Sequence, residues 1–187
     1  MKVQYVLTVI LFWQKLQIIT CSLLEAVIMD DYEAITAALD TSEGQDLLNI
    51  KGSGGQTPLM FAVLGGKKNA VELLLKAGAD VTIGEDDGYT PMHGAGFQGR
   101  SEIAKKLIDH GLNIYDTHRD GYIPFHRACW GTERRHTDTV KVFLEAGVDP
   151  DFLSVDGRSC LDMTRNKGTK KLIKKWQAKA GVRDKEL

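Results

Sequence analysis

The sequence predicts an all-α fold, a solenoid of stacked helix–turn–helix units that carry projecting β-hairpin fingers. Three observations lead to this prediction: a block of sequence recurs at a nearly fixed interval, an apolar segment ending in Gly follows each of the first three blocks, and an Asp-Gly pair separates successive units. Recurrence at this scale is typical of repeat architectures, in which each unit buries its apolar face only against its neighbours.

The recurring blocks begin at Gly55, Gly88, Gly121 and Gly157, so the successive intervals are 33, 33 and 36 residues. They read GQTPLMFAVLGGK, GYTPMHGAGFQGR, GYIPFHRACWGTE and GRSCLDMTRNKG. The first three lead into AVELLLKAGAD, EIAKKLIDHGLN and TVKVFLEAGVD. Each unit therefore supplies two short helices.

The threonines, prolines and glycines of these blocks stand where helices are expected to begin and end. Thr57 and Thr90 are expected as N-caps, because a hydroxyl accepts from the unpaired N–H groups of a helix start. A proline at the first helical position loses no hydrogen bond, and a glycine suits the left-handed residue at a helix end. Prolines stand at 58, 91 and 124, glycines at 78, 111 and 147, and the Asp-Gly turns at 87–88, 120–121 and 156–157.

This pattern resembles the ankyrin repeat family, whose signature is Thr-Pro-Leu-His-x-Ala followed by Leu-Leu-x-x-Gly-Ala-Asp. The resemblance covers residues 22–180 and implies an ankyrin-repeat solenoid with a terminal cap at each end. Met60, Ile123 and Cys160 depart from the motif. The expected units are 22–54 (cap), 55–87, 88–120, 121–156 and 157–180 (cap), with a tail over 181–187 and a longer Gly-rich link over 41–54.

The net charge of −1 argues against a general nucleic-acid binder, but it hides an asymmetry. Residues 157–187 carry ten Lys and Arg against three Asp and Glu, whereas residues 22–156 carry twelve against twenty-two. The basic end either binds anionic groups or is a solvated face that suits the helix dipole.

The two ends of the chain bear on its location. Residues 1–21 form a hydrophobic leader, MKVQYVLTVILFW and onward, which can be a secretory signal cleaved near Ser22, an uncleaved anchor or an amphipathic leader. The chain ends RDKEL, which resembles the Lys-Asp-Glu-Leu retention signal with its first two residues exchanged. The secretory pathway or endoplasmic reticulum lumen and the cytoplasm both stay open, and we expect no stable membrane span.

Cys129, His126 and His136 are candidates for a catalytic or metal site. By register, Cys129 is a helix packing position, so we expect a buried, inert thiol. A disulfide with Cys160 looks geometrically poor. The resemblance implies that His93 and His126 hydrogen-bond to backbone. We expect no enzyme, cofactor or metal site.

The turn between the helices of the 121–156 unit is longer than the others. Pro124 to Gly147 spans 23 residues, whereas Pro58–Gly78 and Pro91–Gly111 span 20. We expect the extra residues to enlarge a solvated loop around 132–137 that carries Arg134, Arg135 and His136.

The family resemblance implies a protein or peptide partner, bound by finger tips and first helices that line a concave groove. Tyr89, Phe97, Tyr122 and Trp130 are expected to form one aromatic stripe there, although each can instead pack within the array. A regulatory subunit of a separate enzyme is the alternative function, and the chain is expected to be a monomer. The expected partner-binding residues are Tyr89, Phe97, Gln98, Arg119, Tyr122, Trp130 and Arg158.

Overall fold

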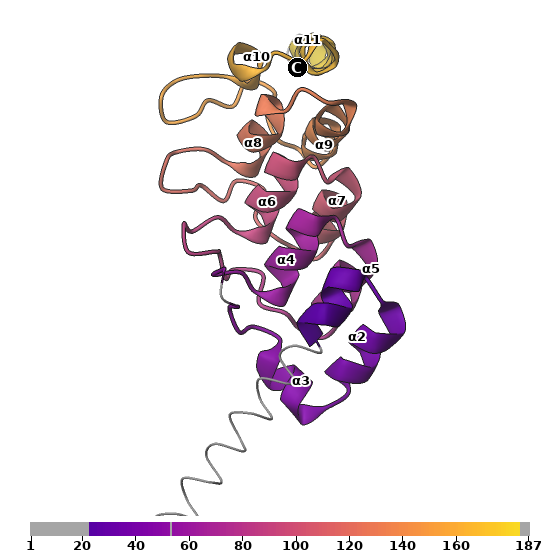
Figure 1. Cartoon of the computed structure of the whole chain (residues 1–187). Helices are drawn as coiled ribbons and strands as arrows, with labels where there is room; N and C mark the ends of the chain where they lie inside the picture. Colours follow the sequence, from indigo (N-terminus) through magenta and orange to yellow (C-terminus); the bar gives the residue numbers. More distant parts are fainter. Residues whose placement is uncertain (1–22, 53, 184–187) are drawn as a thin grey trace, which may run out of the picture. The chain divides into compact units, whose positions relative to one another are not determined.

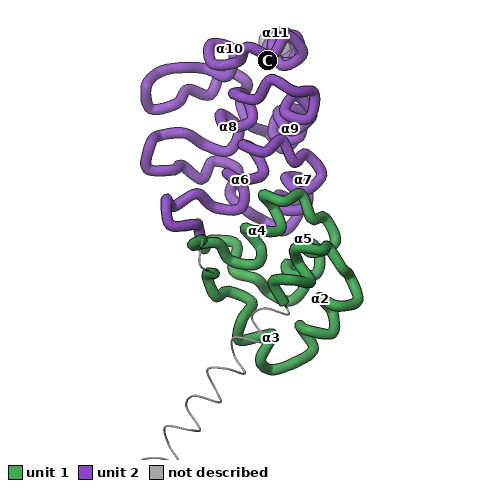
Figure 2. Tube along the Cα trace, viewed as in Figure 1, with its two compact units in different colours: residues 1–83 green, residues 84–187 purple. Residues whose placement is uncertain are grey.

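The structure is a computed structural model that describes residues 23–52 and 54–183. The leader expected over residues 1–21, and the chain end from residue 184, lie outside the described residues. No described helix is both long and apolar enough to cross a membrane. The chain divides into two compact units, residues 1–83 and 84–187 (Figure 2).

Each unit is built from short helices, and the described residues contain no β-strand (Figure 1). Unit 1 contains a helix over residues 23–29, α2 (Tyr32–Leu39), α3 (Ser42–Leu47), α4 (Pro58–Gly65) and α5 (Lys68–Lys76). Unit 2 contains α6 (Pro91–Gln98), α7 (Ser101–Asp109), α8 (Pro124–Trp130), α9 (Arg134–Glu145), α10 (Cys160–Met163) and α11 (Lys167–Arg183).

In unit 1, α2 and α4 both pack against α5, and Val27, Ile35 and Leu74 are fully buried there. Asp30 adopts a left-handed backbone conformation with φ of 57°. Its carboxylate accepts a hydrogen bond from the Ala70 N–H at 2.8 Å. Because α5 has no side-chain cap of its own, Asp30 supplies the missing acceptor from the preceding helix pair.

The Gly-rich link expected over residues 41–54 contains a helix, α3. The Thr41 hydroxyl caps it by accepting from the Gly44 N–H at 3.0 Å, and Leu47 is buried. The expectation of a plain link is therefore wrong for this part. A good N-cap and one buried leucine outweigh the low helix propensity of glycine.

In unit 2, the first helices of the pairs form one row, α6, α8 and α10, and the second helices α7, α9 and α11 form another (Figure 1). Large apolar side chains, among them Met92, Phe125 and Phe143, fill the space between the rows. The contact between α6 and α8 is very close, since a Cβ at Gly96 would lie 2.3 Å from the Pro124 carbonyl oxygen. Only glycine fits at this position.

The helix starts follow the expectation in part. The Thr57 hydroxyl accepts from the Met60 N–H at 3.2 Å, which confirms the N-cap. Thr90 makes no such cap, because its hydroxyl donates to Asp116 at 3.0 Å and contacts His93 at 2.8 Å. At Ile123, which cannot cap, the Nδ1 atom of His126 accepts from the Ile123 N–H at 3.4 Å.

The fingers, expected as β-hairpins, are tight loops without strands in the described chain. In the first finger of unit 2, the Gly88 N–H donates to the Glu85 carbonyl at 2.8 Å and the Glu85 N–H donates to the Tyr89 carbonyl at 3.0 Å. The same pair of bonds closes the loops 118–122 and 154–158. Gly88 alone has positive φ among residues 84–90. One such residue is typical of a three-residue loop, whereas a two-residue type I′ turn needs positive φ at both central residues.

The three extra residues of the 121–156 unit lengthen a helix and do not enlarge a loop. Helix α9 has 12 residues, whereas α5 and α7 have 9 each. Arg134, Arg135 and His136 therefore form the first turn of α9, and the expectation of a long loop is wrong. His136 is buried, and a Cβ at Gly131 would lie 1.9 Å from its ring.

Cys129 and Cys160 form a disulfide between α8 and α10, with their Cα atoms 5.5 Å apart. The expectation of a free, inert thiol and of poor geometry is therefore wrong. It assumed that successive first helices stack level with each other. In fact, the sixth residue of α6, Gly96, contacts the first residue of α8, Pro124. The equivalent pair at the next interface is Cys129 and Cys160, which suits a disulfide.

We predict that this disulfide holds the terminal helices in place. Replacing both cysteines by alanine should lower the free energy of unfolding by about 3 kcal/mol, because the bond closes a long loop. Denaturant unfolding measures this difference. The double variant should be insensitive to dithiothreitol, whereas the wild-type protein should become as unstable as the variant in its presence. Equal stability of oxidised and reduced wild-type protein would contradict the prediction.

Candidate functional site

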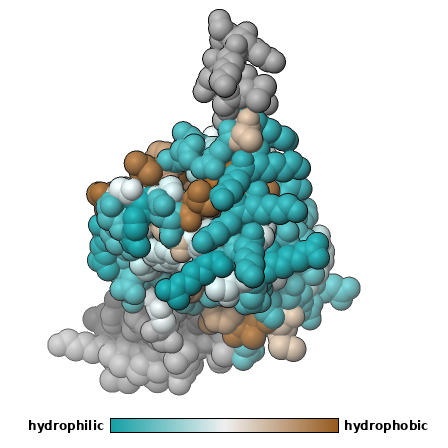
Figure 3. All heavy atoms as spheres, turned by 90° about the horizontal axis from the view of Figure 1, so that it is seen from above, coloured by the Kyte–Doolittle hydropathy of each residue, from teal (hydrophilic) through white to brown (hydrophobic). Residues whose placement is uncertain are grey.

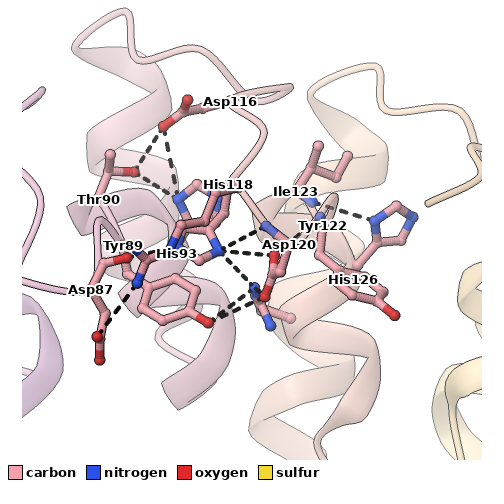
Figure 4. A network of polar contacts seen from close by, with 12 residues as sticks. Asp87, Tyr89, Thr90, His93, Asp116, His118, Asp120, Tyr122, Ile123 and His126 are labelled. Atoms are coloured by element: carbon pink, nitrogen blue, oxygen red, sulfur yellow. Dashed lines mark hydrogen bonds and ion pairs between the residues drawn. The ribbon is translucent and has the colours of Figure 1, made fainter. Parts of the chain in front are cut away.

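Two tyrosines occupy equivalent places in successive finger loops of unit 2. Tyr89 and Tyr122 each follow an Asp-Gly pair, and each hydroxyl donates to the aspartate of the next finger, as Figure 4 shows for Tyr89 and Asp120. The distance from the Tyr89 Oη to Asp120 is 3.2 Å, and that from the Tyr122 Oη to Asp156 is 2.8 Å. Burial raises the pKa of Tyr89, so its hydroxyl stays protonated and able to donate.

Arg127 lies at the centre of these finger loops. Its side chain is only 5% exposed, and its guanidinium carbon lies 4.8 Å from the Tyr89 ring centroid, 5.2 Å from that of Tyr122 and 4.6 Å from that of Trp130. The guanidinium also forms an ion pair with Asp120. Three aromatic faces and one carboxylate thus surround a single cation. Cation–π contacts of this kind strengthen when the cation is desolvated.

The Asp120 carboxylate has two side-chain partners. Its carboxylate accepts from Arg127 and lies 2.8 Å from the Nδ1 atom of His118, whose Nε2 atom donates to the Asp87 carbonyl at 2.8 Å (Figure 4). Burial alone would raise the pKa of Asp120. The hydrogen bonds and charges of Arg127 and His118 outweigh burial and hold this pKa well below its ordinary value. Asp120 is therefore charged throughout the physiological range.

A second cation closes the other end of the cluster. The guanidinium of Arg158 hydrogen-bonds to the Tyr122 hydroxyl and to Asp156, the latter at 2.6 Å. Trp130 packs edge-on against Tyr122 with ring centroids 5.0 Å apart. We call the group formed by Tyr89, Asp120, Tyr122, Arg127, Trp130, Asp156 and Arg158 the Arg127 cluster.

The structure brings together four of the seven sequence-predicted contact residues. Tyr89, Tyr122, Trp130 and Arg158 belong to the Arg127 cluster, and the first three are half-buried. Phe97 is 57% exposed near the end of α6 and lies outside the cluster, as does its neighbour Gln98. Arg119 lies at a loop tip, where it pairs with Asp87 at 3.6 Å in an exposed contact. Such an exposed pair contributes little to stability.

Sequence reasoning missed Arg127, the residue that organises the cluster. The corresponding positions in the two preceding repeats are Phe61 and Gly94. A charged residue there, five residues after a finger tyrosine and flanked by Asp120 and Trp130, is the signal that could have found it. A buried arginine needs a carboxylate partner, and Asp120 lies in the finger loop just before α8.

The residues of the alternative Cys/His catalytic or metal site make other bonds in this structure. Cys129 is bonded to Cys160, so no thiolate is free for attack or metal binding. His126 accepts from the Ile123 N–H and donates from Nε2 to the Phe152 carbonyl at 3.1 Å. His136 contacts the Phe97 carbonyl at 3.2 Å. Within residues 23–52 and 54–183, no three potential ligands gather as a metal site.

The two motif histidines predict a stability change in weak acid. Burial lowers the pKa of His93 and of His126 below the ordinary value of 6.5, since a buried ring resists charging. The unfolded chain takes up these protons first, so stability present above pH 6.5 is lost as the pH falls below it. The melting temperature should therefore drop on acidification through this window, as measured by circular dichroism.

Replacing His93 and His126 by glutamine should make this drop smaller. The carboxylates act in a separate window. Hydrogen bonding from Ser154, with further bonds from Tyr122 and Arg158, lowers the pKa of Asp156 to about 2. The contribution of Asp156 is therefore lost only in strong acid, as the pH falls from the unfolded value near 3.8. An unchanged acid response of the double glutamine variant would show that other groups control it.

Comparison with known proteins agrees with this architecture. A search of curated proteins finds no match to the chain. The family model "Ankyrin repeats (3 copies)" matches residues 23–118 and 83–154, which together make up more than two thirds of the chain. Such repeats generally mediate protein–protein interactions and typically belong to non-enzymatic proteins. The chain therefore belongs to the ankyrin repeat family.

Proposed function

We propose that this chain is a non-enzymatic interaction module that binds a protein or peptide partner against the finger loops and first helices of unit 2. The observation that supports this most is the Arg127 cluster, in which a buried cation fixes three aromatic rings at the finger bases. Tyrosine, tryptophan and arginine are the residues in which binding hot spots are enriched.

The rigidity of the cluster supports binding in a second way. Each tyrosine hydroxyl both donates to an aspartate and accepts from an arginine: Tyr89 from Arg127 at 3.4 Å, and Tyr122 from Arg158. Rings held by several contacts lose little side-chain entropy when a partner arrives. The exposed Phe97 adds apolar surface near the end of α6, and we propose it as a further contact.

Two double variants test the proposal. Tyr122→Ala with Trp130→Ala removes two faces of the cluster, and Phe97→Ala with Gln98→Ala removes exposed contact surface without touching Arg127. Proximity labelling in the native cell first identifies the partner. Titration with the purified partner should then show at least a tenfold higher Kd for each variant, as expected for loss of about 1.4 kcal/mol.

Tyr32→Ala is the matched control, because Tyr32 is an aromatic residue in α2 that is 51% exposed and lies in unit 1. Its Kd should equal that of the wild-type protein. If Tyr122→Ala with Trp130→Ala unfolds the protein, the Phe97/Gln98 variant alone decides. Wild-type affinity of that folded variant, and of the Tyr122/Trp130 variant if it folds, would show that the partner binds elsewhere.

A further inference from the structure

Helix α11 carries a stripe of lysines that make no ion pair within the described residues. Its sequence, KGTKKLIKKWQAKAGVR, contains no acidic residue. Five exposed lysines, at positions 167, 170, 171, 174 and 175, are spaced three or four residues apart, which places them on one face of the helix. The opposite face carries Thr169 and Ile173, both fully buried.

Many cations elsewhere in the described chain pair with carboxylates. Lys76, Lys105 and Lys141 each pair with a glutamate or aspartate four residues away on the same helix. Arg119, Arg127, Arg134, Arg135 and Arg158 also lie near carboxylates. The unpaired stripe is therefore specific to the terminal helix.

The stripe does not stabilise α11. Lys167 and Lys170 lie in the first turn, where the helix dipole disfavours positive charge, and no acidic residue offsets them. Lysines three and four residues apart also repel one another along the whole stripe. Because this charge pattern destabilises the isolated helix, it points to an anionic ligand whose binding offsets the repulsion.

Apolar side chains lie beside this basic helix. Gln177 on α11 donates to Asp151 at 2.6 Å, which fixes the last finger loop against the helix. In that loop, Leu153 is 55% exposed and Val155 is 79% exposed. Figure 3 shows this end of the molecule as a mainly hydrophilic face with hydrophobic side chains beside it. The acidic residues near this helix include Glu133, Asp151, Asp156 and Asp162, and the last two are held by Arg158 and Ser159.

We propose that the α11 end of unit 2 docks on an anionic lipid membrane surface. A basic helix lying flat, with exposed apolar residues beside it, matches the combination by which peripheral proteins bind such surfaces. Compact lysine charges suit a dense layer of headgroups, whereas arginine forks would favour bidentate capture of single phosphates or carboxylates. The lysine stripe lies outside the Arg127 cluster, although Val155 shares its finger loop with Asp156 and Arg158 of that cluster.

Vesicle co-sedimentation tests the proposal with the full chain. Wild-type protein should bind phosphatidylcholine vesicles that contain phosphatidylserine, and high salt should release it. Lys170, Lys171, Lys174 and Lys175 replaced together by glutamine should weaken the phosphatidylserine-dependent binding about six hundredfold, since each of the four lysines near the surface contributes about fivefold. The apolar leader is present in every variant, so only the phosphatidylserine-dependent part is compared.

The matched control replaces Lys76, Lys105, Arg134 and Lys141 by glutamine, which changes the net charge equally and should leave vesicle binding within a few-fold of wild type. The α11 variant should melt at the same temperature as wild type or higher, because it loses like-charge repulsion. Replacing Leu153 and Val155 by serine should weaken vesicle binding even though all the lysines of α11 are kept. Equal phosphatidylserine-dependent binding by wild type and the α11 variant would overturn the proposal. So would binding to duplex DNA or polyglutamate without binding to these vesicles.

Discussion

The staggered contact between successive first helices determines most of the structure of unit 2. The sixth residue of one first helix lies against the first residue of the next, as Gly96 lies against Pro124 and Cys129 against Cys160. The first interface needs a residue without a side chain, and the second has a covalent bond in its place. The same offset brings each finger tyrosine to the aspartate of the next finger.

The buried charge of Arg127 depends on this arrangement. Removing a guanidinium from water costs several kcal/mol unless a carboxylate and good geometry offset it. Asp120 supplies the carboxylate, while the rings of Tyr89, Tyr122 and Trp130 supply polarisable faces. Since these four residues come from two fingers and one helix, the ion pair also fixes the fingers relative to α8. A replacement of Asp120 would therefore disturb rings that it does not touch.

The sequence predicts the parts of this structure that follow local rules. The repeat period, the prolines at helix starts and the glycines at helix ends give the order of the helices, and Gly78, Gly111 and Gly147 have the expected positive φ. The α3 helix was missed because a single N-cap residue is compatible with either a short helix or a loop. The lengthened α9 was missed because three inserted residues can extend either a helix or the loop before it. The disulfide and the full set of contacts in the Arg127 cluster depend on a stagger between helices that the repeat period does not encode. The charged residue at position 127 was the one sequence signal for the cluster. Partner binding stays a prediction for all seven expected contact residues, including the four that the structure brings together in the Arg127 cluster.

The two proposed surfaces of unit 2 depend on the disulfide to different degrees. Helix α10 is a single turn, and a helix this short has little stability of its own. The Cys129–Cys160 bond fixes it to α8. Helix α11 is held further by a hydrogen bond between the Thr137 and Thr169 hydroxyls at 2.8 Å and by one from Asn166 to the Glu133 carbonyl at 3.0 Å. The Arg127 cluster is built mainly from α8 and the two fingers before it. Reduction of the disulfide therefore acts first on the orientation of the lysine stripe, and only through Asp156 and Arg158 on the aromatic rings.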